Sequence, residues 1–301
     1  MNVSIIIVNY NTKELTRNCL RSIFEQTKDI DFEVIVSDNG SSDGSIEMVR
    51  TEFLRVTLIE NGENLGFGKA NNRAAQIARG EYLLFLNSDT ELKNNAVKIF
   101  YDMAMESIEE CVLGCRLCDG NNQEMSSYGC FTKPMLSILR KNIYEFYPWI
   151  LRARLKKIRK RQHQKIENDY FVDFITGADL FISKRLYDSI GGFDENFFMY
   201  FEDDDLCRRC ADKGVKSRII STPKIIHFEG ASSVVKLQKI LVQDRSFFYY
   251  VKKWMSCWQY VAVIFCFLLF FPLRLFSAGL TIKEKIFMFI FDVRLFVECK
   301  A

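Results

Sequence analysis

The sequence lacks the marks of an exported protein. Its first apolar run, Val3–Val8, has no basic region before it, no long apolar core and no small-residue cleavage site. The ten cysteines show no paired, even spacing of a disulfide framework. Cys111, Cys115, Cys118 and Cys130 also do not form the compact pair of pairs that typically binds zinc. These absences favour a reducing, cytoplasmic location and ordinary thiols.

The sequence has little net charge, because 41 Lys and Arg oppose 38 Asp and Glu. The basic residues gather in residues 140–165, where ten Lys or Arg accompany the single Glu145 and aromatic residues precede the charges. This pattern predicts contact with a membrane surface, although a solvated helix face would carry the same charges. Because no nucleic-acid-binding module is recognisable, we expect no nucleic-acid partner.

A run of twenty residues without charge, Trp254–Leu273, indicates a second membrane-associated segment. Basic residues continue beyond it, which disfavours a translocated tail, and Pro272 shortens its apolar core. We therefore expect a monotopic or re-entrant anchor on the inner face of the cell membrane, in preference to a bilayer span or a buried helix. The predicted organisation is a catalytic domain at 1–232 and a helical C-terminal extension at 233–301.

Short apolar runs alternate with helical patterns through residues 3–89, which predicts an α/β fold with a mostly parallel sheet wound by helices. The predicted strands are Val3–Asn9, Phe32–Ser37, Val56–Glu60 and Tyr82–Leu86, and the predicted helices are Lys13–Gln26, Ser45–Phe53 and Lys69–Ala78. Further strands are predicted at Phe171–Ile175, Asp179–Ser183, Lys216–Ile220 and Ile225–Phe228, and further helices near Lys184–Ile190, Asp204–Lys213 and Val234–Lys253. Because ligands bind beyond the carboxyl ends of parallel strands, the residues that follow each strand are candidates for a site.

Polar residues follow the first two predicted strands. Asp38 ends the second strand, where its carboxylate can accept a hydrogen bond from the imide N–H of uracil or thymine, or from a ribose hydroxyl. Asn9 and Asn11 follow the first strand and join this candidate nucleotide site. The alternative is that Asp38 only shapes a turn.

A glycine-containing segment precedes the third predicted helix and contains Asn64, Gly66, Lys69 and Asn72. Backbone N–H groups at the start of a helix can bind a diphosphate or sugar hydroxyls. The segment lacks the spacing of a phosphate-binding P-loop and the third glycine of a dinucleotide-binding fingerprint. It is therefore a candidate substrate-binding segment whose ligand has to be inferred from its neighbours.

The fourth predicted strand is followed by Asn87, Ser88 and Asp89. A carboxylate at a strand end can hold Mg²⁺ or Mn²⁺ against the phosphates of a nucleotide diphosphate. Alternatively, Asp89 caps a helix that begins near Leu92.

Residues 202–205 are four consecutive acids at the start of a predicted helix. Such crowding is relieved by a metal ion, by protons or by helix N–H groups, and it can raise the pKa of a carboxyl group. We expect Asp203 to be the base that takes a proton from an acceptor hydroxyl, with simple helix capping as the alternative. His227, one of only two histidines, is either a ligand of the metal or diphosphate or a core residue.

In their order along the chain, these segments resemble glycosyltransferase family 2, and within it the bacterial rhamnosyltransferase-like enzymes. The matching motifs are Ser4–Asn11, Asp38–Gly44, Asn64–Asn72, Leu86–Thr90, Gly191–Glu195 and Phe198–Cys207, and the resemblance covers residues 3–232. It implies a GT-A fold with a nucleotide-binding half at 1–119, a basic insert at about 120–168 and an acceptor half at 169–232. Asn87 departs from the family's D-x-D pattern, whose last position is Asp89 here.

The resemblance also implies an inverting glycosyltransferase that uses Mg²⁺ or Mn²⁺. It implies that Asp89 holds the metal with His227 nearby, that the catalytic base belongs to the Glu202–Asp203 pair, and that Asp38 recognises the base of the nucleotide. The predicted substrate-binding residues are Asn9, Asn11, Asp38, Asn64, Gly66, Lys69, Asn72, Asn87, Ser88 and Asp205.

The expected reaction is transfer of rhamnose or another hexose from a dTDP- or UDP-sugar to a glycan or lipid-linked acceptor in cell-surface polysaccharide synthesis. Two alternatives stay open at this point. A sugar nucleotidyltransferase would release pyrophosphate but would have no need of the acids at 202–205. A catalytically silent membrane scaffold of a glycan-assembly complex would bind no nucleotide sugar.

Overall fold

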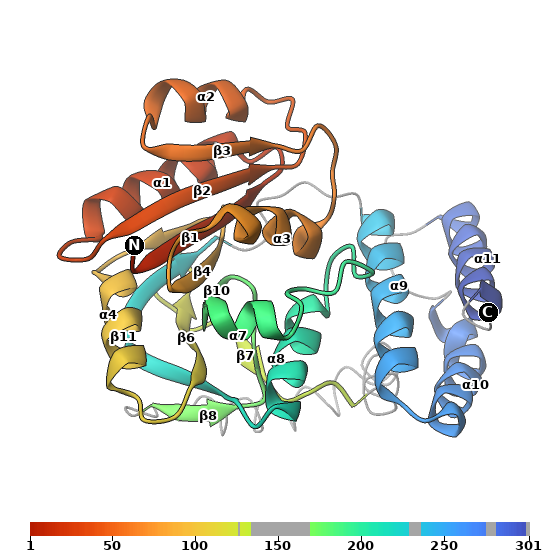
Figure 1. Ribbon diagram of the computed structural model, residues 1–301. Helices are drawn as coiled ribbons and strands as arrows, with labels where there is room; N and C mark the ends of the chain where they lie inside the picture. The colour runs from red at the N-terminus through yellow and green to blue at the C-terminus, as the bar shows by residue number, and fades with distance from the viewer. Residues whose placement is uncertain (126, 134–168, 229–235, 275–280, 299–301) are drawn as a thin grey trace. The chain divides into compact units, whose positions relative to one another are not determined.

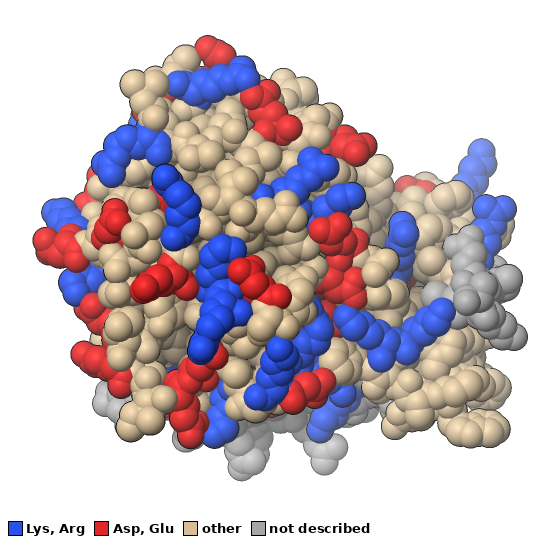
Figure 2. All heavy atoms as spheres, viewed as in Figure 1, with Lys and Arg blue, Asp and Glu red and all other residues tan. Residues whose placement is uncertain are grey.

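The computed structural model describes residues 1–125, 127–133, 169–228, 236–274 and 281–298. The chain divides into two compact units, of which the first comprises Met1–Phe131 with Asn168–Ser233. Figure 2 shows acidic and basic side chains interspersed over the visible face of this unit. The division of 1–232 into two halves and an insert stays a prediction. The basic segment 140–165 lies outside the described residues.

A nine-stranded sheet forms the centre of the first unit, with the order β3-β2-β1-β4-β10-β6-β11-β5 and with β8 paired to β11. Its strands are β1 (Val3–Asn9), β2 (Phe32–Asp38), β3 (Val56–Glu60), β4 (Tyr82–Asn87), β5 (Thr90–Leu92), β6 (Cys111–Cys118), β8 (Tyr170–Val172), β10 (Asp179–Ser183) and β11 (Lys216–His227). Two short strands, β7 (Tyr128–Gly129) and β9 (Phe174–Ile175), form a separate antiparallel pair.

The sheet is mixed, which corrects the prediction of a mostly parallel sheet. The strands β3, β2, β1 and β4 run parallel to one another, as predicted. However, β10 runs antiparallel to both β4 and β6, and β5 and β8 run antiparallel to β11. An apolar run does not encode its direction, so the sequence pattern could not reveal this. As a consequence, the first residue of β10 lies beside the carboxyl end of β4.

Helices cover both faces of the sheet (Figure 1). The helices α1 (Lys13–Gln26), α2 (Ser45–Glu52) and α4 (Ala96–Glu106) pack on one face, and α3 (Phe67–Ile77), α7 (Lys184–Ser189) and α8 (Glu202–Asp212) pack on the other. Strand β1 shows why: Ile5 and Ile7 belong to one core cluster and Ile6 to the other, and all three are fully buried. Apolar residues at every position of a strand require cover on both faces.

Several predicted elements differ from the observed ones. The strands expected at 216–220 and 225–228 form the single strand β11, whose register against β6 shifts between Ile220 and Ile225, around Pro223. A proline cannot donate to the ladder, so an irregularity is expected there. The helix expected to begin near Leu92 begins instead at Ala96, as α4, because Leu92 ends β5. The elements β5, β6, β7 and the C-terminal helix α11 were not predicted.

The second compact unit contains the helices α9 (Lys236–Trp254), α10 (Cys257–Arg274) and α11 (Ile282–Glu298). They share a small core that includes Phe248, Val263 and Met288. The predicted continuous segment 254–273 is interrupted, because the Ser256 N–H donates to Gln259 Oε1 (3.1 Å) and the Gln259 N–H donates to Ser256 Oγ (3.4 Å). This capping box starts a new helix. None of the described helices has both the length and the apolarity needed to cross a membrane.

Candidate functional site

The carboxyl ends of β1 and β2 are joined by the side chain of Asp38, which is 1% exposed. Its Oδ2 accepts from Asn9 Nδ2 (2.5 Å), and its Oδ1 accepts from the Ser41 backbone N–H (2.7 Å). Asp38 therefore does shape the turn after β2. Each carboxylate oxygen can accept more than one hydrogen bond, so recognition of a nucleotide base by Asp38 stays a prediction.

This turn is connected to the loop that follows β4. Thr12 Oγ1 donates to Asn9 Oδ1 (2.7 Å) and lies 2.9 Å from Ser88 Oγ. Asn11 adopts a positive φ of 53°, and its Oδ1 accepts from the Ser42 N–H (2.8 Å). The ends of β1, β2 and β4 thus form one continuous polar edge.

Asp89 and His227 meet at this edge because β5 and β11 are paired, with Thr90 opposite His227. His227 Nε2 lies 3.1 Å from Asp89 Oδ1 and 3.3 Å from Asn87 Nδ2. The alternative interpretation of Asp89 as a helix cap is wrong, because Asn95 occupies the N-cap of α4. A carboxylate and an imidazole side by side form a donor pair suited to a divalent ion such as Mn²⁺.

The acidic segment begins α8 after an unusual turn. Tyr200 and Phe201 both have a φ of 70°, a region that bulky residues rarely adopt and that is enriched at functional sites. The half-buried Asp203 accepts from the Gly177 N–H through Oδ2 (3.3 Å) and from the Asp204 N–H through Oδ1 (2.8 Å). Glu202 is 5% exposed, and its Oε2 has no hydrogen-bond partner among the described residues.

Burial changes the protonation of these two acids. Loss of solvation raises the pKa of Asp203 to about 6, and the nearby charge of Asp204 adds to the shift. Burial also raises the pKa of Glu202 well above its usual range, with the charge of Asp203 as the next cause. Because the two groups interact, they release their protons as a pair. Two backbone N–H groups donate to Asp203 and favour its charged form, whereas Glu202 Oε2 has no such donor among the described residues. Asp203 is therefore the better candidate for a base near neutral pH.

The loop before β10 joins the acids to the Asp89–His227 pair. Gly177 binds Asp203 as described, and the neighbouring Ala178 accepts from the Asn87 N–H through its carbonyl oxygen (3.3 Å). Because β10 runs antiparallel to β4, the loop that precedes β10 lies at the carboxyl end of β4. A chain of direct contacts therefore connects the candidate nucleotide, metal and base residues.

The glycine-containing segment packs against the residues that precede α8. Gly66 has a φ of 83°, and an added Cβ would lie 2.2 Å from the carbonyl oxygen of Phe198. The Phe67 N–H donates to that same oxygen (2.8 Å), and Asn64 Oδ1 accepts from the Gly66 N–H (3.0 Å). Lys69 lies half-buried in the first turn of α3.

Two predicted substrate-binding residues make contacts within the fold, and their role in substrate binding stays a prediction. Asn72 binds Tyr187 and Phe193 and also Glu195, with distances from 2.5 to 3.0 Å, so both its amide oxygen and its amide nitrogen are occupied. Asp205 has a fully buried side chain that pairs with Arg209 Nε (2.9 Å). The i,i+4 spacing of Asp205 and Arg209 was the signal that could have identified this pair from the sequence.

Asp179, the first residue of β10, was not predicted as part of the site. It is fully buried, its Oδ2 accepts from the Cys115 N–H (2.5 Å), and its Oδ1 has no hydrogen-bond partner among the residues described. Burial raises the pKa of Asp179 to about 7, and the bond from Cys115 and the charge of His227 oppose the shift. A single carboxylate that opens an otherwise apolar strand was the available sequence signal.

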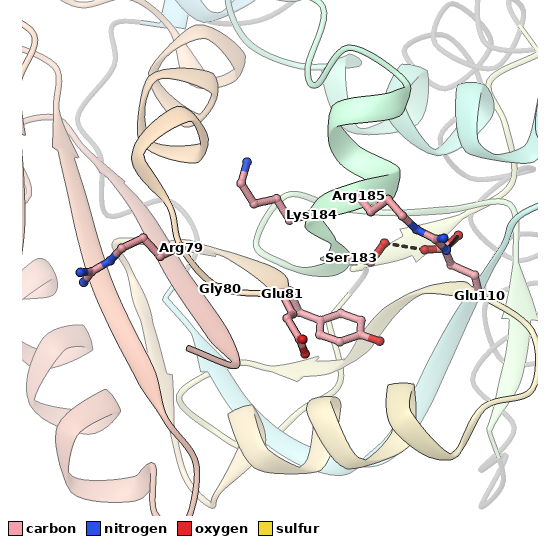
Figure 3. Close-up of a pocket in the computed structure, with 8 residues that line it drawn as sticks. Arg79, Gly80, Glu81, Glu110, Ser183, Lys184 and Arg185 are labelled. Atoms are coloured by element: carbon pink, nitrogen blue, oxygen red, sulfur yellow. Dashed lines mark hydrogen bonds and ion pairs between the residues drawn. The ribbon is translucent and has the colours of Figure 1, made fainter.

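A surface pocket of about 500 Å³ lies at the opposite edge of the sheet, at the start of β4 and the end of β10. Figure 3 shows Ser183 and Arg185 directed toward Glu110 in this pocket. It contains none of the candidate site residues. Within the described part of the chain, no group of three or more His, Cys, Asp or Glu side chains could hold a metal by itself. Asp89 and His227 would therefore need phosphate or water oxygens to complete a metal site, which is common for Mg²⁺ bound with nucleotides.

Comparison with known proteins identifies the family. Residues 4–167 match the family model for glycosyl transferase family 2. The chain belongs to this family. Proteins similar to it include the rhamnosyltransferase WbbL of Escherichia coli, 26% identical over 233 residues, which are 75% of this chain and 83% of the relative. The N-acetylglucosaminyl-diphospho-decaprenol L-rhamnosyltransferase of Mycobacterium tuberculosis is 24% identical over 218 residues, which are 66% of this chain and 67% of the relative.

Solved structures show that the fold is GT-A. GalNAc-T7, solved with UDP, GalNAc and Mn²⁺, aligns with a TM-score of 0.63 and 14% identity over 97% of this chain and 54% of that chain. Staphylococcus aureus TarS 1-349 aligns with a TM-score of 0.54 and 17% identity over 99% of this chain and 81% of that chain. Together with the family model, the rhamnosyltransferase relatives show that this chain is a rhamnosyltransferase-like enzyme of glycosyl transferase family 2.

Proposed function

We propose that this enzyme transfers rhamnose or another hexose from a dTDP- or UDP-sugar to a hydroxyl of a glycan or lipid-linked acceptor, with inversion, in cell-surface polysaccharide synthesis. The family and the rhamnosyltransferase relatives support the class of reaction. The observation that carries the proposal is the raised pKa of Asp203 at the same sheet edge as the Asp89–His227 pair. Direct displacement requires both a base and a neutralised leaving group at one place.

In this proposal Asp203 takes the proton of the acceptor hydroxyl, while Glu202 keeps its own proton and so adds no second charge beside the base. Asp89 and His227 would hold Mg²⁺ or Mn²⁺, and the ion would supply positive charge against the diphosphate leaving group. The rest of the donor is bound by neighbouring residues. The nucleotide contacts the polar edge at the ends of β1, β2 and β4, which contains Asn9, Asn11, Asp38, Asn87 and Ser88. The segment at the start of α3, with Asn64, Gly66 and Lys69, also contacts the donor.

The test compares Asp203→Asn with Asp212→Asn, which makes the same change at an exposed position at the far end of α8. Transfer is measured with a panel of dTDP- and UDP-sugars, Mn²⁺ and acceptor, by release of the nucleoside diphosphate. We expect Asp203→Asn to lose roughly 10²–10⁴-fold in rate and the control to keep the parent rate. Parent-like transfer by Asp203→Asn would refute the role of the base. Pyrophosphate as the product would instead support a nucleotidyltransferase, and absence of nucleotide-sugar binding would support a scaffold.

We also propose that the C-terminal unit lies on the cytoplasmic face of the cell membrane. On α10 the exposed fractions are 86% for Trp258, 64% for Phe265 and 59% for Leu269, and their spacing places them on one helix face. Exposed Ile286 and Phe287 add to the apolar surface of α11. Large exposed apolar surface of this kind is typical of helices that lie in a membrane interface.

Binding to vesicles that contain anionic lipid tests the membrane proposal. Phe265→Glu should reduce cosedimentation of the full chain with the vesicles, because a charge would enter the apolar interface. Leu54→Glu is the matched control, since Leu54 is 87% exposed and belongs to the other unit. Equal cosedimentation of parent and Phe265→Glu would contradict the proposal.

A further inference from the structure

The carboxylate of Asp179 replaces a backbone acceptor between two strands. In the antiparallel pairing of β10 with β6, Phe181 lies opposite Leu113. Two residues further toward the carboxyl end of β6, the Cys115 N–H donates to the side chain of Asp179, through Oδ2 (2.5 Å). This bond uses one carboxylate oxygen. The other, Oδ1, is buried and has no partner among the described residues. Buried polar atoms normally have partners, so an exception calls for an explanation.

The position of Asp179 suggests that explanation. It lies opposite Leu86 of β4, one residue before Asn87, and its neighbour Ala178 accepts from the Asn87 N–H (3.3 Å). Asn87 Nδ2 in turn lies 3.3 Å from His227 Nε2. The strand β11, which ends at His227, runs parallel to β6, so its end reaches the same edge. The charge of His227 acts on the Asp179 carboxyl, which is consistent with their proximity.

We propose that Asp179 is a positioning residue for His227. Its second oxygen accepts a hydrogen bond from one buried water molecule that in turn accepts from the imidazole N–H, and this orients Nε2 toward the divalent ion and the diphosphate. Histidine ligands commonly donate their other ring N–H to a carboxylate, and loss of that partner weakens metal binding by about 10–100-fold. The inference rests on the proposed function, because it assumes that His227 helps to hold the metal.

The test uses Asp179→Asn in the full chain. The asparagine oxygen can still accept from the Cys115 N–H, but the asparagine amide nitrogen is a donor and cannot accept a hydrogen bond in place of Oδ1. Mn²⁺ binding is measured by calorimetry in the presence of dTDP or UDP, and we expect the affinity to fall by about 10–100-fold. In a His227→Ala background the same substitution should have no further effect, because Asp179 acts through the imidazole. Glu33→Gln is the matched control, a buried carboxylate on β2 that binds Ser4 and Arg79.

A second measurement needs no metal. The chain has only two histidines, so the ring nitrogens of His227 can be observed in ¹⁵N-histidine-labelled protein and assigned by comparison with a His163→Gln variant. Asp179→Asn should shift the His227 ring signals and leave those of His163 in place. If Asp179→Asn does not fold, Asp179→Ser provides the same two comparisons.

Three results would overturn the inference: parent-like Mn²⁺ affinity of Asp179→Asn, unchanged His227 signals, or additive losses in the double variant. They leave the proposed function intact as long as the parent protein binds Mn²⁺ with a nucleotide. Failure of the parent itself to bind Mn²⁺ with either nucleotide would instead refute the metal role in the proposed function, and the inference with it.

Discussion

Substitution of Asn72 by alanine should destabilise the catalytic unit rather than weaken substrate binding. The amide of Asn72 accepts from the Tyr187 hydroxyl (2.5 Å) and donates to the Phe193 carbonyl oxygen (2.9 Å). Both partners belong to residues that are at most 3% exposed. The Phe193 N–H also binds Asn72, but it retains a longer bond to the Tyr187 hydroxyl (3.3 Å). The substitution thus removes the Asn72 partner of two buried groups, the Tyr187 hydroxyl and the Phe193 carbonyl oxygen, while the Phe193 N–H keeps its longer bond.

Each such orphaned group costs about 1–2 kcal/mol, so we expect the free energy of unfolding to fall by about 2–4 kcal/mol. The bond to Glu195 is exposed and adds little. This is a large share of a typical total of about 5–15 kcal/mol, and it should appear as an earlier midpoint in urea with an unchanged slope. Gln76→Ala, at an exposed position of the same helix, should change the midpoint very little. An unchanged midpoint together with a raised KM for the donor would refute this reasoning and restore Asn72 to the substrate-binding set.

Three further predictions follow from the site. The rate kcat/KM should fall as pH decreases through about 6, because burial raises the pKa of Asp203 to that value and a protonated carboxyl cannot accept the acceptor proton; an acid limb near pH 4 would contradict this. Gly66→Ala should lower the free energy of unfolding in urea by about 2 kcal/mol or more, because the added Cβ would lie 2.2 Å from the Phe198 carbonyl oxygen. Gly62→Ala is the control: Gly62 has a similar φ but no atom within 4 Å of an added Cβ, so this substitution should cost only about 1–2 kcal/mol. Asp205→Ala should lower the free energy of unfolding by about 3 kcal/mol, because it leaves Arg209 without its buried partner; an effect below 1 kcal/mol would show that water compensates Arg209.

The first four strands could be predicted from the sequence because each is defined by its own residues and by the turns beside it. Strands β1 to β4 begin at the predicted residues and end within one residue of them, since each is a nearly continuous apolar run between polar turns. Helices α1, α2 and α3 follow the apolar spacing in the same way. By contrast, the apolar strand β6 was missed although the turn residues Asp119-Gly120-Asn121-Asn122 follow it directly, and the helix expected from near Leu92 begins four residues later, at Ala96 of α4. Residues after Trp254 were read as one run, and the Ser256–Gln259 capping box that divides it depends on only two side chains.

The direction of each strand explains which site residues could be predicted. Searching the residues that follow each strand is sound for strands that are parallel to one another, and it identifies Asn9, Asp38, Asp89 and His227. When a strand runs antiparallel to these, its first residue and the residues before it lie at the edge of the sheet where ligands bind. Thus Gly177, which binds Asp203, and Asp179 were overlooked, because the direction of β10 is set by its pairing with β4 and not by its own sequence. Where the direction of a strand is unknown, both of its ends should therefore be searched for functional residues.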